Sequence, residues 1–309
     1  MMGIAFVFPG QGVQKSGMTL DFYEKSDESK KIFDIAEKNL DFDIKKVCFT
    51  DNREIDITEY TQAALLTACI SMYSELKKYN INPDVCGGLS LGEYAAMVVA
   101  GVMEFGDAVR AVRKRGILMQ NAVPLGAGAM SAVLGLDNTT VENICNDIDG
   151  VGIANYNCPG QVVITGIPHA IKVASERLSE AGAKRILPLN VSGPFHSFML
   201  KGAGDELESY LADITINKPV IPYVTNVTAE YVTDNAHIRE LLGKQVHSPV
   251  KWQHSVEKMI NNGVDTFVEI GPGRTISGFI RKINSNVKVY NIQKFEDVKK
   301  VVEALKGDK

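Results

Sequence analysis

The feature that most constrains the fold is the pentapeptide Gly88-Leu89-Ser90-Leu91-Gly92, which lies between a short apolar run and a helix-like stretch. A serine between two glycines at a strand-to-helix junction is typical of a nucleophile elbow, a sharp turn that lifts the hydroxyl clear of the sheet. Glycine suits such a turn because strand and helix approach so closely that a Cβ would clash. The helix behind the serine also directs backbone N–H groups toward negative charge.

The pentapeptide by itself is weak evidence, because glycine and serine are common residues. A helix cap in a tight turn explains the same letters without any chemistry. The apolar run before residue 88 and the helix-like residues 93–100 favour the functional interpretation. A reactive serine also needs a base and an electrophilic site elsewhere in the chain.

Strand-like and helix-like stretches alternate along the chain, which is typical of an α/β protein. Residues 4–8 are all apolar, as in a strand buried on both faces. Long helices are expected at 59–78 and 105–123, the second ending before Pro124. We therefore predict a large, hydrolase-like domain with a central, mainly parallel sheet, formed by residues 1–125 and 195–309.

The middle of the chain predicts a second, smaller domain. Strands are expected at 128–136, 151–156, 161–165 and 184–189, with helices at 139–148 and 168–181. The order β-α-β-β-α-β is that of a ferredoxin-like module. We expect this module, residues 126–194, to be inserted into the large domain.

Charge and cysteine usage narrow the class of protein. The net charge of -4 argues against a general nucleic-acid binder. Five cysteines without any C-x-x-C pair fit reduced thiols of a cytoplasmic protein, and no His/Cys spacing suggests a metal site. Residues 1–8 lack a basic leader, and no apolar run approaches the length of a membrane span.

One histidine stands out as the candidate base. His196 follows a rigid Gly-Pro segment, residues 192–195, where the chain is expected to re-enter the large domain. A loop at a domain boundary borders the interdomain cleft, where ligand sites tend to form. A solvated or structurally satisfied histidine is the alternative. Surface roles are expected for His169, His237 and His254. His247 stays open as a second candidate for the base.

The glycine-rich loop after the first strand, residues 8–14, is the second candidate element. The carboxyl ends of parallel strands share one edge of a sheet, so Gln11 and Ser90 are expected at the same edge. The backbone N–H groups of Leu91 and Gln11 would then form an oxyanion hole. A flexible glycine loop is the alternative.

Arg115 is the third candidate. It ends a run of three cations that would ordinarily mark a solvated helix face, but Gly116 and apolar residues follow it. This pattern favours an arginine that points into a cleft. A guanidinium there could hold a substrate carboxylate in a bidentate pair.

Taken together, these segments resemble the malonyl-CoA:acyl-carrier-protein transacylases of fatty-acid synthesis over essentially the whole chain. Many motifs match in the same order. They are Phe8-Pro9-Gly10-Gln11-Gly12, Gly88-Leu89-Ser90-Leu91-Gly92-Glu93, Arg115-Gly116-x-x-Met119-Gln120, Asn155-Tyr156-Asn157-x-Pro159-Gly160-Gln161, Phe195-His196, Ser248-Pro249-Val250-x-Trp252 and Glu269-Ile270-Gly271-Pro272-Gly273.

The resemblance implies that Ser90 is the acyl nucleophile, His196 its base and Arg115 the grip on the malonyl carboxylate. Gln11 and Leu91 would form the oxyanion hole. The family orients its histidine with a backbone carbonyl rather than an acidic side chain, and Gln245 is the matching position.

Further pocket residues follow from the same resemblance. Asn155, Asn157 and Met119 would border the substrate, and Phe195 resembles the malonyl-selective pattern, in which a bulky ring leaves little room for an α-methyl group. The family usually has histidine directly before the nucleophile, and here the residue is Leu89.

The implied reaction is a two-step, ping-pong transfer from malonyl-CoA to the phosphopantetheine thiol of an acyl carrier protein. It implies no bound cofactor, because the phosphopantetheine is carried by the partner. Cations near the cleft are candidates for docking this acidic partner, with solvated surface charge as the alternative: Arg110, Arg113, Lys114, Lys184 and Arg185.

Three other functions stay open. The first is a discrete acyltransferase serving a polyketide synthase, whose chemistry would be the same. The second is a serine thioesterase or esterase with the same elbow, which Arg115 and the inserted domain argue against. The third is a non-catalytic module that docks carrier proteins.

Overall fold

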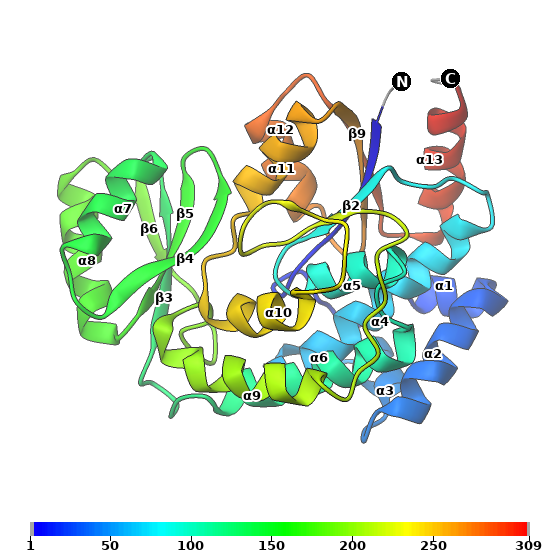
Figure 1. Cartoon of the computed structure of the whole chain (residues 1–309), viewed down its shortest axis with the longest axis horizontal. Coiled ribbons are helices and arrows are strands. Elements are labelled where there is room, and N and C mark those ends of the chain that lie inside the picture. Colours follow the sequence, from blue (N-terminus) through cyan, green and yellow to red (C-terminus); the bar gives the residue numbers. More distant parts are fainter. Residues whose placement is uncertain (1–2, 308–309) are drawn as a thin grey trace.

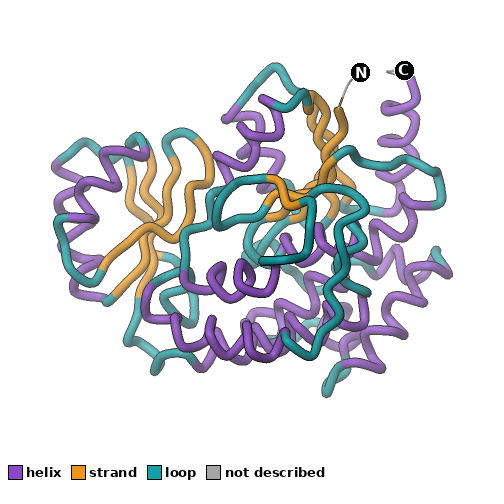
Figure 2. The backbone as a smooth tube through the Cα atoms, viewed as in Figure 1, coloured by secondary structure: helices purple, strands orange, loops and turns teal. Residues whose placement is uncertain are grey.

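The computed structural model describes residues 3–307. Its larger sheet has six strands, and Figures 1 and 2 show how helices are arranged around it. The strands run in the order β10-β9-β1-β2-β7-β8, parallel except for the edge pair β7 and β8. Their bounds are β1 Gly3–Phe8, β2 Val85–Gly88, β7 Tyr223–Val224, β8 Tyr231–Val232, β9 Val264–Ile270 and β10 Lys288–Ile292. The mainly parallel sheet predicted from the sequence is confirmed.

β1 lies at the centre of this sheet and is covered on both faces. Phe6 and Phe8 belong to the large core that also holds α4 (Thr58–Lys77), whereas Ala5 and Val7 pack in the cluster around Trp252 of α11 (Trp252–Asn261). Alternate residues of a strand point to opposite faces, so a strand buried on both sides must be apolar throughout. This explains the uninterrupted apolar run at 4–8.

The smaller sheet is antiparallel and lies apart from the first, at the left of Figure 1. Its four strands follow the order β4-β5-β3-β6 and carry two helices on one side. This is the β-α-β-β-α-β arrangement that the sequence predicts. The elements are β3 Ala129–Leu134, α7 Asn138–Asn146, β4 Val151–Cys158, β5 Gln161–Gly166, α8 Pro168–Glu180 and β6 Arg185–Pro188.

Backbone hydrogen bonds link β4 of the small sheet to the segment that precedes α11. Tyr156 N donates to Val250 O at 2.9 Å, and Val250 N donates to Ala154 O at 2.8 Å. The strand β4 therefore pairs with the segment around Val250, which fixes Asn155 and Asn157 at this junction. The sequence predicts the strand only to residue 156, two residues short of its end at Cys158.

The remaining helices surround the large sheet. α6 ends at residue 121, three residues before Pro124, where a helix stop is expected. None of the helices among residues 3–307 has the length and apolar character that crossing a membrane requires. Their bounds are α1 Leu20–Lys25, α2 Asp27–Asn39, α3 Ile44–Phe49, α5 Gly92–Val99, α6 Phe105–Asn121, α9 Lys201–Leu211, α10 Ile238–His247, α12 Thr275–Ile283 and α13 Phe295–Gly307, with short 3-10 turns at Glu54–Asp56 and Phe198–Leu200.

Candidate active site

The turn between β2 and α5 places Ser90 at the carboxyl edge of the sheet. Ser90 has φ 53°, a left-handed conformation that side-chain-bearing residues rarely adopt. A Cβ on Gly88 would lie 2.0 Å from the carbonyl carbon of Gly92, and one on Gly92 would lie 2.1 Å from Phe8 O. Both glycines of the pentapeptide are therefore required by close backbone approach.

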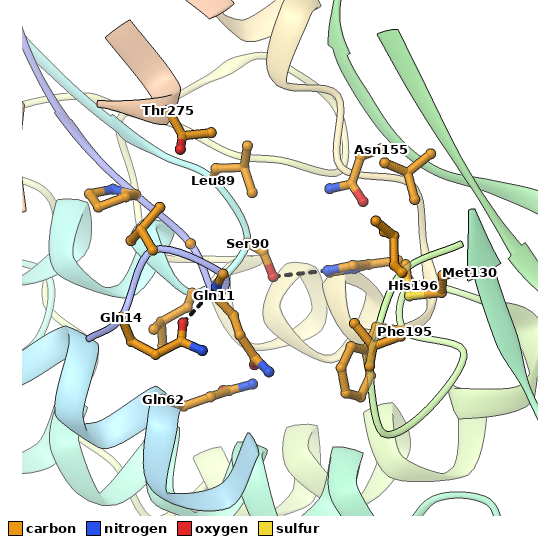
Figure 3. Close-up of a pocket in the computed structure, with 18 of the residues that line it drawn as sticks. Gln11, Gln14, Gln62, Leu89, Ser90, Met130, Asn155, Phe195, His196 and Thr275 are labelled. Atoms are coloured by element: carbon orange, nitrogen blue, oxygen red, sulfur yellow. Dashed lines mark hydrogen bonds between the residues drawn. The ribbon is translucent and has the colours of Figure 1, made fainter. Parts of the chain in front are cut away.

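Ser90, in the turn after β2, lies next to His196, in the loop after β6 (Figure 3). Ser90 Oγ lies 2.8 Å from His196 Nε2, and His196 Nδ1 lies 2.8 Å from the backbone oxygen of Gln245. A carbonyl oxygen only accepts, so Nδ1 carries the proton and Nε2 presents its lone pair to the serine hydroxyl. The histidine is oriented without an acidic side chain.

His196 is neutral over the physiological range. Burial, followed by the positive charge of Arg115, lowers its pKa from 6.5 to about 4. The hydrogen bonds to the backbone of Gln245 and Ser248 act the opposite way and are weaker. A neutral imidazole is the form that accepts a proton, so the base is ready for use at neutral pH.

Arg115 is a fully buried cation beside the nucleophile. Its guanidinium donates to Ser90 Oγ and to Gln245 Oε1, both at 3.0 Å, and to Gln62 Oε1 at 2.6 Å. Its Nε has no partner, and no carboxylate of residues 3–307 forms an ion pair with it. Burial lowers its pKa, with Tyr94 and Glu93 acting in the opposite direction. Such a cation lacks the counter-charge that buried ions normally have.

Two backbone donors flank the serine. Within residues 3–307, neither Gln11 N nor Leu91 N has a hydrogen-bond acceptor. The Gln11 side chain is held aside by a 3.1 Å hydrogen bond to Thr58 Oγ1. Figure 3 shows Gln11 and Ser90 close together at the same side of the cavity. The two N–H groups are therefore available to an anion beside Ser90.

A cavity of about 720 Å³ opens over this centre, lined by the loops that follow β1 and β2 and by strands of the small sheet. Met119 lines it from α6, and Phe195 lines it from the loop that follows β6. Asn155 and Asn157 line it from β4. Phe195 is 7 % exposed, and the two asparagines are nearly as buried. Leu89, the residue before the nucleophile, also faces the cavity (Figure 3). All predicted site residues line this cavity except Arg115 and Gln245, which do not line it but hydrogen-bond to Ser90.

The sequence did not indicate how much the side chain of Gln245 and the residue Asn226 contribute to this centre. Gln245 Nε2 donates to Ser90 O at 3.0 Å and to Glu93 Oε2 at 2.6 Å. Asn226 Oδ1 accepts from Ser90 N, and its amide donates to Gly88 O, both at 2.6 Å. The only indication in the sequence is the place of Asn226 in the chain. It follows β7, the parallel neighbour of β2, and so lies at the same edge of the sheet as Ser90.

Glu93 is a buried carboxyl within the same network. It accepts from Gln245 and from Asn226 N, yet burial raises its pKa from 4.5 to about 7 because desolvation outweighs those hydrogen bonds. Its carboxyl stands one side chain away from Arg115, linked to it by the Gln245 amide. The network therefore keeps this carboxyl out of direct contact with the arginine.

The other histidines lie outside the cavity. His169 and His237 are exposed, His254 packs edge-on against Tyr156, and His247 ends α10 beside Gly204. His247 was the one rival that the sequence left open, and the structure does not bring it to Ser90.

The cations of α6 are already used within the chain. Arg113 lies between two carboxylates, and Arg110 and Lys114 have one each, so these three do not stand free to attract an acidic partner. Lys184 and Arg185 are exposed and form no ion pair among residues 3–307. The pairs on α6 are Arg110–Asp107, Arg113–Asp41, Arg113–Glu59 and Lys114–Glu206.

Comparison with known proteins identifies the family. The protein-family model described as the acyl transferase domain matches residues 5–294. The malonyl CoA-acyl carrier protein transacylase of Bacillus subtilis is 42% identical over 313 residues, covering 100% of this chain and 99% of that protein. The Staphylococcus aureus protein of the same name (strain MSSA476) is 46% identical over 304 residues, covering 97% and 98%.

Solved structures agree. A malonyl CoA-acyl carrier protein transacylase from Clostridium perfringens superposes with a TM-score of 0.95 at 40% identity, covering 99% of this chain and 98% of that one. A malonyl-transacylase in complex with a type II polyketide synthase acyl-carrier protein gives 0.94 at 36% identity, covering 98% and 99%. The chain belongs to the acyl transferase family and, within it, to the malonyl CoA-acyl carrier protein transacylases.

Proposed function

We propose that the protein transfers the malonyl group from malonyl-CoA to the phosphopantetheine thiol of acyl carrier protein through a malonyl ester on Ser90. The observation that carries this proposal is Arg115, a buried guanidinium without a carboxylate partner that donates to the oxygen of a Ser–His pair. A hydrolase of neutral esters has no use for an uncompensated cation there. An acyl group that ends in a carboxylate supplies the missing counter-charge.

In the first half-reaction, His196 Nε2 takes the proton of Ser90 as Oγ attacks the thioester carbon. The negative charge that develops on the thioester oxygen is stabilised by the N–H groups of Gln11 and Leu91. The carbon–sulfur bond then breaks, and His196 returns its proton to the sulfur of the departing CoA. Throughout, Arg115 holds the malonyl carboxylate and fixes the acyl group relative to Ser90.

The second half-reaction runs the same steps in reverse with a different thiol. His196 removes the proton from the phosphopantetheine thiol of the carrier protein, and the sulfur attacks the malonyl-Ser90 ester. Collapse of the tetrahedral intermediate breaks the bond to Ser90 Oγ, which recovers the proton from His196. The same two backbone donors serve both intermediates, because the attacked carbonyl occupies the same position.

The walls of the cavity account for selection among acyl groups. Phe195 and Met119 occupy space that an α-methyl branch would need, and Asn155 and Asn157 offer amides to the polar parts of the substrate. One methyl group in a pocket is worth about 1–3 kcal/mol, so the preference for malonyl over methylmalonyl is partial. The carboxylate contact with Arg115 governs the preference over acetyl.

Three further assignments complete the proposal. Residues 1–125 and 195–309 form the large catalytic domain, and residues 126–194 form the ferredoxin-like small domain. Five buried, unpaired cysteines favour a cytoplasmic location. Lys184 and Arg185, at the start of β6, attract the acidic carrier protein. If they do so, added salt raises the KM for carrier protein and leaves acylation by malonyl-CoA unchanged; equal sensitivity of both steps would remove this assignment.

A polyketide synthase carrier protein is the second candidate acceptor. It is favoured by one observation, the similarity to the malonyl-transacylase solved with such a carrier. Because the chemistry at Ser90 is identical, the two acceptors are separated only by comparing kcat/KM for carrier proteins of the two pathways.

Initial-rate kinetics test the proposed reaction. Varying malonyl-CoA at several concentrations of carrier protein should give the parallel double-reciprocal lines of a ping-pong mechanism, with transfer far exceeding hydrolysis. The Ser90→Ala variant should be inactive, and Ser209→Ala, which removes an exposed hydroxyl on α9, should match the wild type. Intersecting lines, or hydrolysis that outruns transfer at saturating carrier protein, would refute the proposal.

A further inference from the structure

We propose that Asn226 is a positioning residue that holds Ser90 in its reactive backbone conformation. The inference rests on the proposed function, in which Ser90 is the nucleophile. Asn226 lies 136 residues from Ser90 in the chain and bridges the elbow with one side-chain amide. Its Oδ1 accepts from Ser90 N and its Nδ2 donates to Gly88 O, each at 2.6 Å.

The amide can face the elbow in only one way. A swapped amide would set its NH2 against Ser90 N–H and its oxygen against Gly88 O, so both contacts would be lost. The backbone of Asn226 is fixed as well, because its N–H donates to Glu93 Oε2 at 3.0 Å and its carbonyl accepts from Lys251 N at 3.0 Å. The residue is fully buried, and all four of its polar groups have partners.

These contacts act on a residue that the chain would not otherwise hold in place. Ser90 has φ 53°, and a non-glycine residue keeps such a conformation only when its surroundings impose it. Asn226 fixes the peptide group before Ser90, while Gln245 Nε2 and Glu93 N fix the carbonyl after it. With both peptide groups fixed, Oγ stays 2.8 Å from His196 Nε2.

The two hydrogen bonds of Asn226 with Ser90 N and Gly88 O, called the clamp below, also determine which backbone N–H group of the elbow remains available to the oxyanion. Ser90 N–H is engaged by Asn226, which leaves Leu91 N–H as the elbow's donor to the oxyanion. Asn226 itself does not line the cavity and so has no contact with the acyl group. Its loss should therefore slow the attack by Ser90 without weakening the binding of malonyl-CoA, which depends on Arg115.

Rapid-quench acylation with radioactive malonyl-CoA, without carrier protein, measures this effect. We expect Asn226→Ala to lower the maximal acylation rate constant about 100-fold, the cost typical of a misplaced reacting group, with the half-saturating malonyl-CoA concentration nearly unchanged. The matched control is Asn235→Ala, which also removes a side-chain amide bonded to a backbone carbonyl, that of Ile216, away from the site. The control should acylate at the wild-type rate.

A second variant separates positioning from loss of volume. Asn226→Asp keeps the size and one acceptor but sets a carboxylate oxygen against Gly88 O, so we expect acylation at least as slow as in Asn226→Ala. Each variant is assayed well below its own melting temperature. If Asn226→Ala does not fold, Asn226→Asp supplies the comparison.

The outcomes keep the two proposals distinct. Absence of label on wild-type Ser90 would refute the proposed function, and with it the clamp, which requires Ser90 to be the nucleophile. Normal labelling of the wild type, together with wild-type acylation rates in Asn226→Ala or Asn226→Asp, would overturn the clamp alone. A loss confined to the half-saturating concentration would also overturn it, because that is the signature of a binding residue.

Discussion

At the scale of single residues, the site is defined by an unpaired charge. Burying a guanidinium without an ion partner is costly, and Arg115 is held instead by neutral oxygens of Gln62, Gln245 and Ser90. The nearest acid, Glu93, contacts Gln245 rather than the arginine. In the proposed function the carboxylate of the substrate supplies the missing counter-charge, and two predictions follow at this scale.

Removing the charge of Arg115 should abolish the preference for malonyl groups. Charge-assisted hydrogen bonds contribute about 1.5–3 kcal/mol each, so Arg115→Met should lower kcat/KM for malonyl-CoA by about 100-fold or more. Acetyl-CoA, which has no carboxylate, should lose much less. A substrate panel measures the ratio, with Arg110→Met, an exposed arginine of the same helix, as control. A malonyl preference retained in Arg115→Met would contradict the assignment.

The acidic limb of the pH profile should lie near the lowered pKa of His196. The histidine is neutral, and therefore active as a base, at any pH above about 4, so acylation should stay level from pH 8 down to about pH 5. Arg115→Met removes a positive charge that lowers this pKa, so the limb should move toward 6.5. The rate of Ser90 sulfonylation by a neutral sulfonyl fluoride measures the limb without a substrate carboxylate. A wild-type limb near 6.5 would show that the histidine is not buried as described.

At the scale of elements, the β2–α5 turn is dictated by backbone proximity. The strand, the serine and the helix occupy consecutive residues, so local pattern sufficed to predict the turn and its nucleophile. The contacts from Asn226 and Gln245 join residues more than 130 positions apart, and only the packing of β7 and α10 against the elbow creates them. No periodicity or spacing in the sequence carries that information.

The short helices α1 and α3 escaped prediction for a related reason. Each has six residues, too few to be stable alone, so they depend on the core that they pack against. The ferredoxin-like order, by contrast, was predictable, because its strands and helices are long enough to show their own periodicity.

A methyl group on Gly88 should prevent the elbow from forming. Its Cβ would lie 2.0 Å from backbone atoms of Gly92 that cannot move without breaking the turn. Gly88→Ala should therefore lower the free energy of unfolding by about 4 kcal/mol or more, a loss that few single substitutions reach. Gly278→Ala on α12, where the space for a Cβ is open, should be neutral or gain up to about 1 kcal/mol. Denaturant titration measures both, and a stable, active Gly88→Ala protein would contradict this account.

At the scale of the whole molecule, the cavity lies between loops of the large sheet and strands of the small one. The turn after β2 supplies the nucleophile, the loop after β6 the base and α6 the arginine, while β4, bonded to Val250 through its backbone, supplies the opposing wall. The buried ionisable groups at this junction also affect the stability of the entire fold. Burial raises the pKa of Glu93 and lowers that of His196, so their contributions to the pH dependence of stability have opposite signs.

Removing the Glu93 carboxyl should change how the free energy of unfolding depends on pH. The folded protein holds a proton on Glu93 between pH 4.5 and about 7 that the unfolded chain has released, so this carboxyl costs stability as pH rises through that window. Below 6.5, the unfolded chain protonates His196 while the folded protein does not, so stability falls as pH drops toward 4. Relative to the wild type, Glu93→Gln should therefore lose stability more steeply on acidification, by up to about 1.4 kcal/mol per pH unit.

Unfolding free energies measured across pH 4.5–7 provide the comparison. Parallel curves for the wild type and Glu93→Gln would mean that Glu93 titrates as an ordinary carboxyl. Glu142→Gln, which alters a carboxyl of the small unit outside the active-site network, serves as the control.

The most direct test of the central claim is the mass of the protein after incubation with malonyl-CoA alone. We expect one added malonyl group on the peptide that contains Ser90. It should be discharged when the carrier protein with its phosphopantetheine arm is added, and it should be absent from Ser90→Ala. An unmodified wild-type protein under conditions of active transfer, or an adduct that persists in Ser90→Ala, would contradict it.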